Sequence, residues 1–353
     1  MTEISVQPDL PRARPGERVL EVEDLHVEFR IPRGTVSAVN GVSYTLDAGE
    51  TLAILGESGS GKSVSAQAIM GLIDTPPGFV TRGAIRFLER DILQMDEEEH
   101  RRLRGRRIAM IFQDALTALN PVFPVGWQIG EMLRQHAGYS RRDARDRAVE
   151  LMELVGIPSA AERVGNYPHE FSGGMRQRVM IAMALALDPD VLIADEPTTA
   201  LDVTVQAQVM ELLARLQRET GMGLILITHD LGVVVETADR VAVMYAGQIV
   251  ETGTVDEVFS RPAHPYTEGL MQSIPRLEQK GDRLEPIEGA PPALSAIPAG
   301  CAFHPRCSYR TEVCWQQDPP LYDVADALEV TGLPIPGRRG TACHHFQEVL
   351  RGE

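Results

Sequence analysis

The residues from Gly56 to Ser63 combine three glycines with a lysine and a terminal hydroxyl group. They fit the pattern G-x-x-x-x-G-K-S/T at every fixed position. Glycines let backbone N–H groups approach a phosphate and adopt unusual dihedral angles. We expect Lys62 to reach the β- and γ-phosphates of a nucleoside triphosphate, and the Ser63 hydroxyl to be a ligand of Mg²⁺. The predicted nucleotide-binding residues of this stretch are Gly56, Glu57, Ser58, Gly59, Ser60, Gly61, Lys62, Ser63 and Val64.

The segments on either side of this loop are the elements that would position it. Leu52–Leu55 is a short apolar run typical of a buried strand, and Val64–Ile73 is predicted to be a helix. A helix that starts near Gly61 directs its free N–H groups and its positive dipole end toward the phosphates. A Gly/Ser-rich turn without a ligand is the alternative, but the strand and the helix favour a phosphate site.

Two adjacent carboxylates follow another apolar run. Val191–Ala194 is typical of a buried strand, and it leads directly into Asp195 and Glu196. Burying two acids together is costly unless a cation lies beside them, and Mg²⁺ bound to ATP would be that cation. We expect Asp195 to hold the metal and Glu196 to polarise the water that attacks the γ-phosphate. The alternative is an acidic turn at a strand end.

Two further polar residues come where predicted strands end. Gln113 follows Arg107–Phe112, and His229 follows Leu224–Thr228. We expect Gln113 to meet Mg²⁺ or the attacking water, and His229 to contact the γ-phosphate. Each residue alone is weak evidence, because a lone histidine or glutamine at a strand end is more often structural.

A second glycine-rich helix start lies further along the chain. Phe171–Arg178 opens a helix that we expect to continue through Leu187. Ser172 is a favourable N-cap, and Gly173 and Gly174 leave backbone N–H groups accessible. The segment therefore predicts a second anion-binding helix start, although it has no lysine of the phosphate-loop type.

The remaining segments supply the frame. Apolar residues alternate through Val19–Asp47, which predicts antiparallel strands. Phe29 lies in this region and could stack on an adenine ring, or it could be a core or edge-strand aromatic residue. Residues 115–170 are predicted to form a helical subdomain, because apolar residues recur at helical spacing in Gln128–His136 and Arg141–Val155.

Composition excludes some classes of protein. The chain has 353 residues and a formal net charge of −16, which argues against a nucleic-acid partner. The arginine-rich run 101–107 follows four acidic residues and is interpreted as a solvated helix of mixed charge. No apolar run is long enough to span a membrane, and residues 1–18 form a polar tail without a signal-peptide pattern. A soluble intracellular protein is expected.

The motifs together, in their order along the chain, resemble the ATP-binding subunit of an ABC transporter over about Leu20 to Gly253. Ser172, Gly173 and Gly174 carry most of the specificity. The resemblance implies an α/β fold with a P-loop NTPase core, a mainly parallel sheet and flanking helices. An N-terminal antiparallel β subdomain, the helical insertion and a small irregular, metal-stapled C-terminal extension complete it.

The resemblance also implies a role for each matching residue. Two such subunits pack head to tail around two ATP molecules, and closing of the dimer drives the transmembrane subunits. Met175 replaces the usual glutamine of the signature, which could make the site that uses this signature less efficient. The implied roles are catalysis by Glu196, His229 and Gln113, Mg²⁺ ligation through Ser63, Gln113 and Asp195, action of the signature Ser172, Gly173, Gly174 and Met175 on the partner's ATP, and a cross-dimer contact at Asp202.

The tail narrows the family. Arg261–Thr267 contains His-Pro-Tyr, and the Pro- and Gly-rich region around it resembles the C-terminal extension of oligopeptide and dipeptide importer ATPases. The implied domains are 19–255, the ATPase, and 256–353, the extension. The implied partners are a second, related ATPase subunit, two transmembrane permease subunits and an extracytoplasmic peptide-binding protein. The implied location is the cytoplasmic face of the inner membrane, as a peripheral subunit.

All four cysteines fall in this tail, at Cys301, Cys307, Cys314 and Cys343. Four clustered thiols suggest a metal centre, and four cysteines suit Zn²⁺ or an iron–sulfur cluster. Zinc usually takes closely spaced cysteine pairs, which are absent. The resemblance implies a 4Fe–4S cluster. Zinc, with histidine ligands as an option, and unligated thiols stay open; the nearby histidines are His304, His344 and His345.

Three other functions fit parts of this sequence. The same engine could serve another solute, such as nickel or a sugar, because the cargo does not meet these residues. A soluble ABC ATPase of translation or DNA repair usually carries two cassettes or a long coiled coil, and both are absent here. An iron–sulfur sensor with a vestigial ATPase is disfavoured by the intact Lys62, Asp195 and Glu196.

Overall fold

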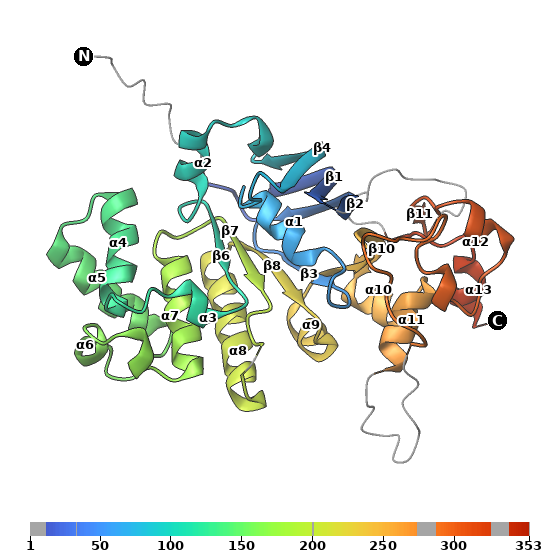
Figure 1. Cartoon of the computed structure of the whole chain (residues 1–353). Coiled ribbons are helices and arrows are strands. Elements are labelled where there is room, and N and C mark those ends of the chain that lie inside the picture. Colours follow the sequence, from blue (N-terminus) through green and yellow to red (C-terminus); the bar gives the residue numbers. More distant parts are fainter. Residues whose placement is uncertain (1–11, 33, 200, 274–286, 326–338, 353) are drawn as a thin grey trace.

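The structure is a computed structural model that describes residues 12–32, 34–199, 201–273, 287–325 and 339–352. Residues 1–11 of the predicted tail, and Ala200 of the segment before Asp202, lie outside this description. A central sheet runs through the molecule, a group of helices lies at one end, and the C-terminal extension lies at the other (Figure 1).

The central sheet is parallel at its core. Its strand order is β11-β12-β10-β9-β3-β8-β7-β6. Every residue of β3, β6, β7 and β8 is buried, as expected for parallel strands covered on both faces. The parallel strands are β3 (Thr51–Leu55), β6 (Ile108–Ile111), β7 (Val191–Asp195), β8 (Gly223–Thr228) and β9 (Arg240–Tyr245); the antiparallel ones are β10 (Gln248–Thr254), β11 (Tyr322–Asp323) and β12 (Gly340–Thr341).

A second, antiparallel sheet confirms the pattern expected near the N-terminus. Its order is β2-β1-β4-β5, and alternate residues of β1 are buried. Phe29 is half-buried in β1 and packs against the core that this sheet shares with β3. The strands are β1 (Arg18–Ile31), β2 (Gly34–Asp47), β4 (Gly78–Phe87) and β5 (Arg90–Asp91); η1 (Ile92–Gln94) and α2 (Glu97–Leu103) follow them.

The interpretation of residues 101–107 as a solvated helix of mixed charge is right for the part that lies in α2 but wrong for Arg107, the last residue of the run. Within α2, Glu98 pairs with Arg101 and Arg102 at exposed positions. The side chain of Arg107, however, is only 9% exposed and its Nε lies 2.5 Å from Oδ2 of Asp190. Arg107 directly precedes β6, so it ties the start of that strand to the chain entering β7 instead of facing solvent.

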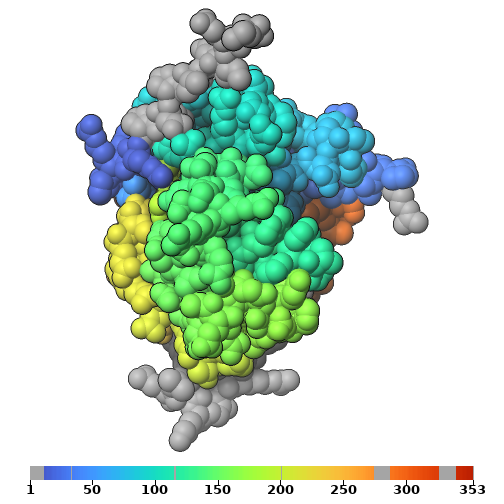
Figure 2. All heavy atoms as spheres, turned by 90° about the vertical axis from the view of Figure 1, so that its left-hand side faces the viewer, coloured from blue at the N-terminus to red at the C-terminus, as the bar shows by residue number. Residues whose placement is uncertain are grey.

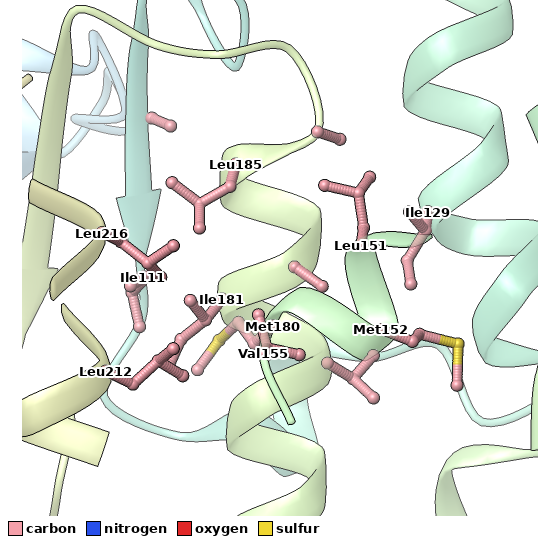
Figure 3. Packing of buried hydrophobic residues seen from close by; sticks show 14 of the residues in the cluster. Ile111, Ile129, Leu151, Met152, Val155, Met180, Ile181, Leu185, Leu212 and Leu216 are labelled. Carbon is pink, nitrogen blue, oxygen red and sulfur yellow. The ribbon is translucent and has the colours of Figure 1, made fainter. Parts of the chain in front are cut away.

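The predicted helical subdomain is present between β6 and β7. Its helices are α3 (Ala115–Ala118), α4 (Val125–Ala137), α5 (Arg141–Leu154), α6 (Ala160–Arg163) and η2 (Pro168–Glu170). Figure 3 shows Ile129 of α4 and Leu151 of α5 in the same buried cluster as Ile181 of α7 (Gly173–Leu185) and Leu212 of α8 (Val203–Thr220). Because α7 precedes β7 directly, this cluster joins the helical subdomain to the nucleotide core.

The helix after the phosphate loop and the helix after β8 flank the same sheet (Figure 1). The first, α1, covers Lys62–Ile69, so it begins two residues earlier and ends four residues earlier than Val64–Ile73. The second, α9, covers Leu231–Thr237 and follows His229 directly. In the described part of the chain, no helix is both long and apolar enough to cross a membrane.

The extension continues the core instead of standing apart from it. Tyr266, Ala302 and Phe303 belong to the same buried cluster as Leu55 of β3 and Val243 of β9. Strands β11 and β12 extend the central sheet beyond β10. The helices of the extension are α10 (Val255–Ser260), α11 (Pro265–Gln272), η3 (His304–Arg306), α12 (Glu312–Gln316) and α13 (Phe346–Arg351).

Candidate active site

The phosphate loop joins β3 to α1 and depends on its glycines. Gly56 and Gly61 have φ of 153° and 101°, in the region that side chains other than glycine avoid. A Cβ atom on Gly56 would lie 2.2 Å from the Met244 carbonyl oxygen, and one on Gly61 would lie 2.3 Å from that of Ala38. The close approach of backbone on both sides therefore requires glycine at these two positions.

Lys62 is buried inside this loop. Its Nζ donates hydrogen bonds to the carbonyl oxygens of Gly56, at 2.7 Å, and Glu57, at 2.9 Å. Burial lowers the pKa of Lys62, whereas the nearby Glu196 and Asp195 raise it. The ammonium group thus lies within the loop, where phosphate oxygens could replace these carbonyl acceptors.

Ser63 and Asp195 meet at the start of α1. The Ser63 hydroxyl donates to Oδ1 of Asp195 at 3.0 Å, although the two residues lie on different elements. Burial raises the pKa of Asp195, and the Ser63 hydrogen bond opposes that shift. Hydroxyl and carboxylate oxygens are the donors that Mg²⁺ prefers, so this pair fits the expected metal.

Glu196 stands at the centre of the strand-end residues. Its Oε2 accepts hydrogen bonds from Gln113 Nε2 at 2.9 Å and from the Thr199 hydroxyl at 2.8 Å, and its Oε1 lies 3.4 Å from His229 Nδ1. Its φ of 46° is unusual for a residue with a side chain. Thr199 was not among the predicted site residues, and nothing in the sequence distinguishes its hydroxyl from that of Thr198.

The signature residues form a helix cap. Ser172 Oγ accepts a hydrogen bond from Met175 N at 3.3 Å at the start of α7. Asp202 similarly caps α8 by accepting from Val205 N at 3.0 Å. Across the described ranges, no hydrogen bond or ion pair links Ser172–Met175 to Lys62, Asp195 or Glu196. The chain itself therefore does not join its signature to its own phosphate loop by such bonds.

The cysteines lie near one another, as the tail sequence predicts. The Cys301 N–H donates to the Cys314 carbonyl oxygen at 2.9 Å, and no disulfide joins the four residues. Burial raises the pKa of Cys301 and of Cys307 to about 11, and neighbouring cysteines add to both shifts. Burial also raises the pKa of Cys343, again with a contribution from the other three thiols.

This proximity does not amount to a formed metal site. Among the described residues, no group of three or more His, Cys, Asp or Glu side chains is arranged to hold a metal ion. The mutual effects on the thiol pKa values show only that the four sulfurs lie within electrostatic reach. The metal-stapled character of the extension therefore stays a prediction.

Comparison with known proteins agrees with the geometry of the site. Residues 39–199 match the family model of the ABC transporter, and residues 250–314 match that of the oligopeptide/dipeptide transporter C-terminal region. The chain is 57% identical over 310 residues to the oligopeptide transport ATP-binding protein OppD of Bacillus subtilis, covering 88% of this chain and 87% of that protein. This chain belongs to the ATP-binding subunits of ABC transporters.

Further relatives place the subunit in the same branch. It is 55% identical over 298 residues to the dipeptide transport ATP-binding protein DppD of Bacillus subtilis, covering 84% of this chain and 89% of the relative. A solved dimeric ATP-binding cassette, MJ0796 bound to ADP and Pi, is similar at a TM-score of 0.60 and 26% identity, over 67% of this chain and 98% of that one. The subunit is an ABC ATPase, and its hydrolysis of ATP is coupled to transport.

Proposed function

We propose that this subunit hydrolyses ATP to power the import of peptides across the cytoplasmic membrane, and that these peptides are dipeptides or oligopeptides. The observation that supports the proposal is that one chain combines a complete set of polar residues at the strand ends around Glu196 with a C-terminal extension of the oligopeptide/dipeptide transporter type. The two relatives are named as ATP-binding proteins of oligopeptide and dipeptide transport. The transported molecule does not contact the nucleotide site, so the extension and the relatives carry the choice of cargo.

The residues of the site have distinct proposed roles in hydrolysis. Lys62 and the loop N–H groups bind the β- and γ-phosphates, and Glu196 accepts a proton from the attacking water. Mg²⁺, when bound, would neutralise phosphate charge; Ser63, Gln113 and Asp195 are its proposed ligands. His229 senses the γ-phosphate. Glu196 is oriented for its role because Gln113, Thr199 and His229 surround its two oxygens.

Phe29 has the least support of the proposed nucleotide contacts. An adenine ring would have to stack on a side chain that is half-buried and packs against the core beside β3. Replacing Phe29 with alanine and comparing the affinities for ATP and for pyrophosphate tests this role. A loss for ATP alone would support stacking, whereas unchanged affinity for both would exclude it.

We propose that the working assembly contains a second, related ATPase subunit, placed head to tail. Ser172–Met175 would then act on the ATP held by the partner, and Asp202 would contact the partner across the dimer. The start of α7 supports this role, because helix N-termini bind anions and, among the described residues, no hydrogen bond links it to the chain's own Lys62 or Ser63. The MJ0796 cassette was solved as a dimer.

The helical subdomain is the proposed contact with two transmembrane permease subunits. It covers much of the face shown in Figure 2, on the side of the molecule away from the extension. Phe123 and Trp127 stack with centroids 4.1 Å apart, and their exposed fractions are 37% and 38%. Val122 beside them is 68% exposed. An exposed apolar patch of this kind is typical of a protein contact. The subunit would lie at the cytoplasmic face of the membrane.

We propose a 4Fe–4S cluster for the four cysteines, held by Cys301, Cys307, Cys314 and Cys343. The proximity of the four cysteines supports the proposal, because such a cluster takes four cysteine ligands. Burial raises the pKa of Cys301, Cys307 and Cys343, so these thiols would have to release their protons on binding the metal. The cluster would cross-link the extension. Anaerobic purification followed by iron, sulfide and zinc analysis tests it. About four irons per chain would support the cluster, whereas one zinc or no metal would exclude it.

Reconstitution tests the transport function directly. The subunit would be assembled with its permeases and its partner ATPase in vesicles, with the extracytoplasmic peptide-binding protein outside. Dipeptides and oligopeptides should stimulate ATP hydrolysis and accumulate inside, and the Glu196→Gln complex should do neither. Accumulation of Ni²⁺ or a sugar, but not of peptide, would show that the proposed cargo is wrong and would leave the proposed ATPase function unchanged. ATP hydrolysis that no permease affects would favour a soluble ATPase.

A further inference from the structure

Glu57, the second residue of the phosphate loop, makes contacts through three of its own groups: the carbonyl oxygen, the backbone N–H and the carboxylate. Its carbonyl oxygen accepts a hydrogen bond from Lys62 Nζ at 2.9 Å, inside the loop. Its N–H donates to the Tyr266 hydroxyl at 2.9 Å. Its carboxylate forms a two-pronged pair with Arg306, at 2.7 Å and 3.1 Å. Two of the three contacts therefore come from the C-terminal extension, more than 200 residues away in sequence.

Tyr266 brings a rigid contact to this point. It is the second residue of α11, has no exposed surface, and its backbone N–H donates to Nδ1 of His264, which caps the helix. Its ring lies 4.7 Å from that of Tyr245 and 5.5 Å from that of Phe303. The hydroxyl that meets the Glu57 N–H therefore belongs to a fully buried ring that packs against Tyr245 and Phe303.

Arg306 is fixed as firmly. Its side chain is only 5% exposed, and its Nε donates to the Glu288 carbonyl oxygen at 3.1 Å. The guanidinium also lies 5.8 Å from the ring centroid of Tyr245 and 5.9 Å from that of Phe303. A planar guanidinium that meets a carboxylate with two parallel N–H groups is a strong and directional pair.

Among the described residues, no hydrogen bond from the extension reaches the outer part of the loop. Ser58 and Gly59 are exposed, and a cavity of about 320 Å³ separates this part of the loop from Pro291–Leu294 of the extension. The loop must nevertheless hold its N–H groups in place for a triphosphate. Its position therefore depends on how Glu57 is held.

We propose that Arg306 and Tyr266 are positioning residues for ATP binding, through which the extension holds the phosphate loop by Glu57. Arg306 also neutralises the Glu57 carboxylate, which would otherwise lie unpaired close to the bound phosphates and repel them. The inference rests on ATP binding by this loop and not on the cargo or on any metal. A failure of the peptide-import proposal would leave it unchanged.

The contact also couples two parts of the molecule. Arg306 is the last residue of the turn η3, between Cys301 and Cys307, so the conformation of this turn sets where the guanidinium lies. By linkage, if the turn affects nucleotide affinity, then bound nucleotide must stabilise the turn equally. The extension is then a control point for the ATPase as well as a family-specific addition.

The experiment is a double-mutant cycle on the full chain, with MgADP affinity measured by titration calorimetry. Arg306→Gln should weaken MgADP about tenfold, the loss expected for one charged hydrogen-bonded pair. In a Glu57→Gln background, Arg306→Gln should weaken MgADP much less, because the pair that it removes is already broken. Arg310→Gln is the matched control, since Arg310 lies in the same segment but bonds only to the Pro305 carbonyl oxygen among the contacts described.

Two outcomes would overturn the proposal. Affinity unchanged in Arg306→Gln would mean that the pair does not position the loop. An equal loss with Glu57 and with Gln at position 57 would mean that Arg306 only supports the fold. If Arg306→Gln does not fold, Tyr266→Phe replaces it, because it removes only the hydroxyl group. Tyr266→Phe should weaken the binding of MgADP a few-fold without a change in the far-ultraviolet circular dichroism spectrum. Unchanged affinity for MgADP would then refute the proposal.

Hydrogen exchange supplies the reciprocal measurement. Saturating MgADP should slow amide exchange in residues 301–310 of the unmodified chain, and this protection should fall in the Glu57→Gln variant. Equal exchange in this segment with and without MgADP would contradict the coupling, even if affinity changed in the variants.

Discussion

The side-chain amide of Gln113 donates a hydrogen bond of 2.9 Å to the carboxylate of Glu196, across 83 residues of sequence. Gln113 follows β6 and Glu196 follows β7, and these two strands are neighbours in the parallel sheet. Parallel strands place their carboxyl ends at one edge, which is where α/β sheets bind their ligands. The relationship explains why two residues far apart in the sequence lie together in one candidate site.

Replacing Glu196 by glutamine should reduce ATP turnover at least about a hundredfold, because it removes the proposed base for the attacking water. Nucleotide affinity should change little, since glutamine keeps the shape of the side chain. Steady-state phosphate release and MgADP titration measure the two effects. Glu211→Gln, at an exposed position of α8, is the matched control. Full residual turnover in the assembled complex would deny Glu196 this role.

Asp195→Asn should stabilise the nucleotide-free chain at neutral pH while abolishing Mg²⁺-dependent turnover. Burial raises the pKa of Asp195, so its ionised form costs stability at any pH above that raised pKa. Asparagine removes the charge and still accepts from Ser63. The gain in Tm should shrink as the pH falls toward the ordinary carboxyl pKa of about 3.9, where the folded aspartic acid is neutral. A variant less stable than the parent at neutral pH would contradict this account.

Met175→Gln should raise the turnover of the assembled complex, because it restores a polar side chain at the signature, which we propose acts on the partner's ATP. The structure adds a cost, since the Met175 side chain packs against the hydrophobic cluster beneath α7. We therefore expect the isolated chain to lose about 1 kcal/mol of stability. Phosphate release by the complex and thermal unfolding of the subunit measure the two effects. Unchanged turnover would count against the hypothesis.

Arg339→Gln should destabilise the extension by about 3 kcal/mol or more, because it leaves the fully buried carboxylate of Glu251 without its cation. Burial raises the pKa of Glu251, so the loss should be smaller at low pH, where its carboxyl is neutral. Chemical unfolding at two pH values measures this.

The paired variant supplies the control for this prediction. Adding Glu251→Gln to Arg339→Gln should restore part of the lost stability, because it removes the unpaired charge. The amide oxygen can still accept from one of the N–H groups of Ala263 and His264, which donate to different oxygens of the carboxylate. If the double variant is no more stable than Arg339→Gln, the loss does not come from an unpaired charge.

The sequence was sufficient for the main features that depend on local pattern, although the bounds of α1 and the environment of Arg107 differ from the prediction. The loop from Gly56 to Ser63 is specified by residue type at fixed spacing, and buried parallel strands appear as continuous apolar runs. The helical subdomain follows from its 3.6-residue periodicity. The family follows from the order of motifs along the chain, because residue types and spacings can be recognised without knowledge of three-dimensional contacts.

Only the tertiary structure decided which distant residues meet. Thr199 joins Glu196, Arg107 pairs with Asp190 instead of facing solvent, and Arg306 pairs with Glu57 although 249 residues separate them in the sequence. Each contact depends on strand order and on the packing of separate segments, and neither leaves a periodic trace in the sequence. A charged residue looks the same in the sequence whether it is solvated or buried beside a partner. The sequence therefore shows which chemical groups are present, and the tertiary structure determines which of them are in contact.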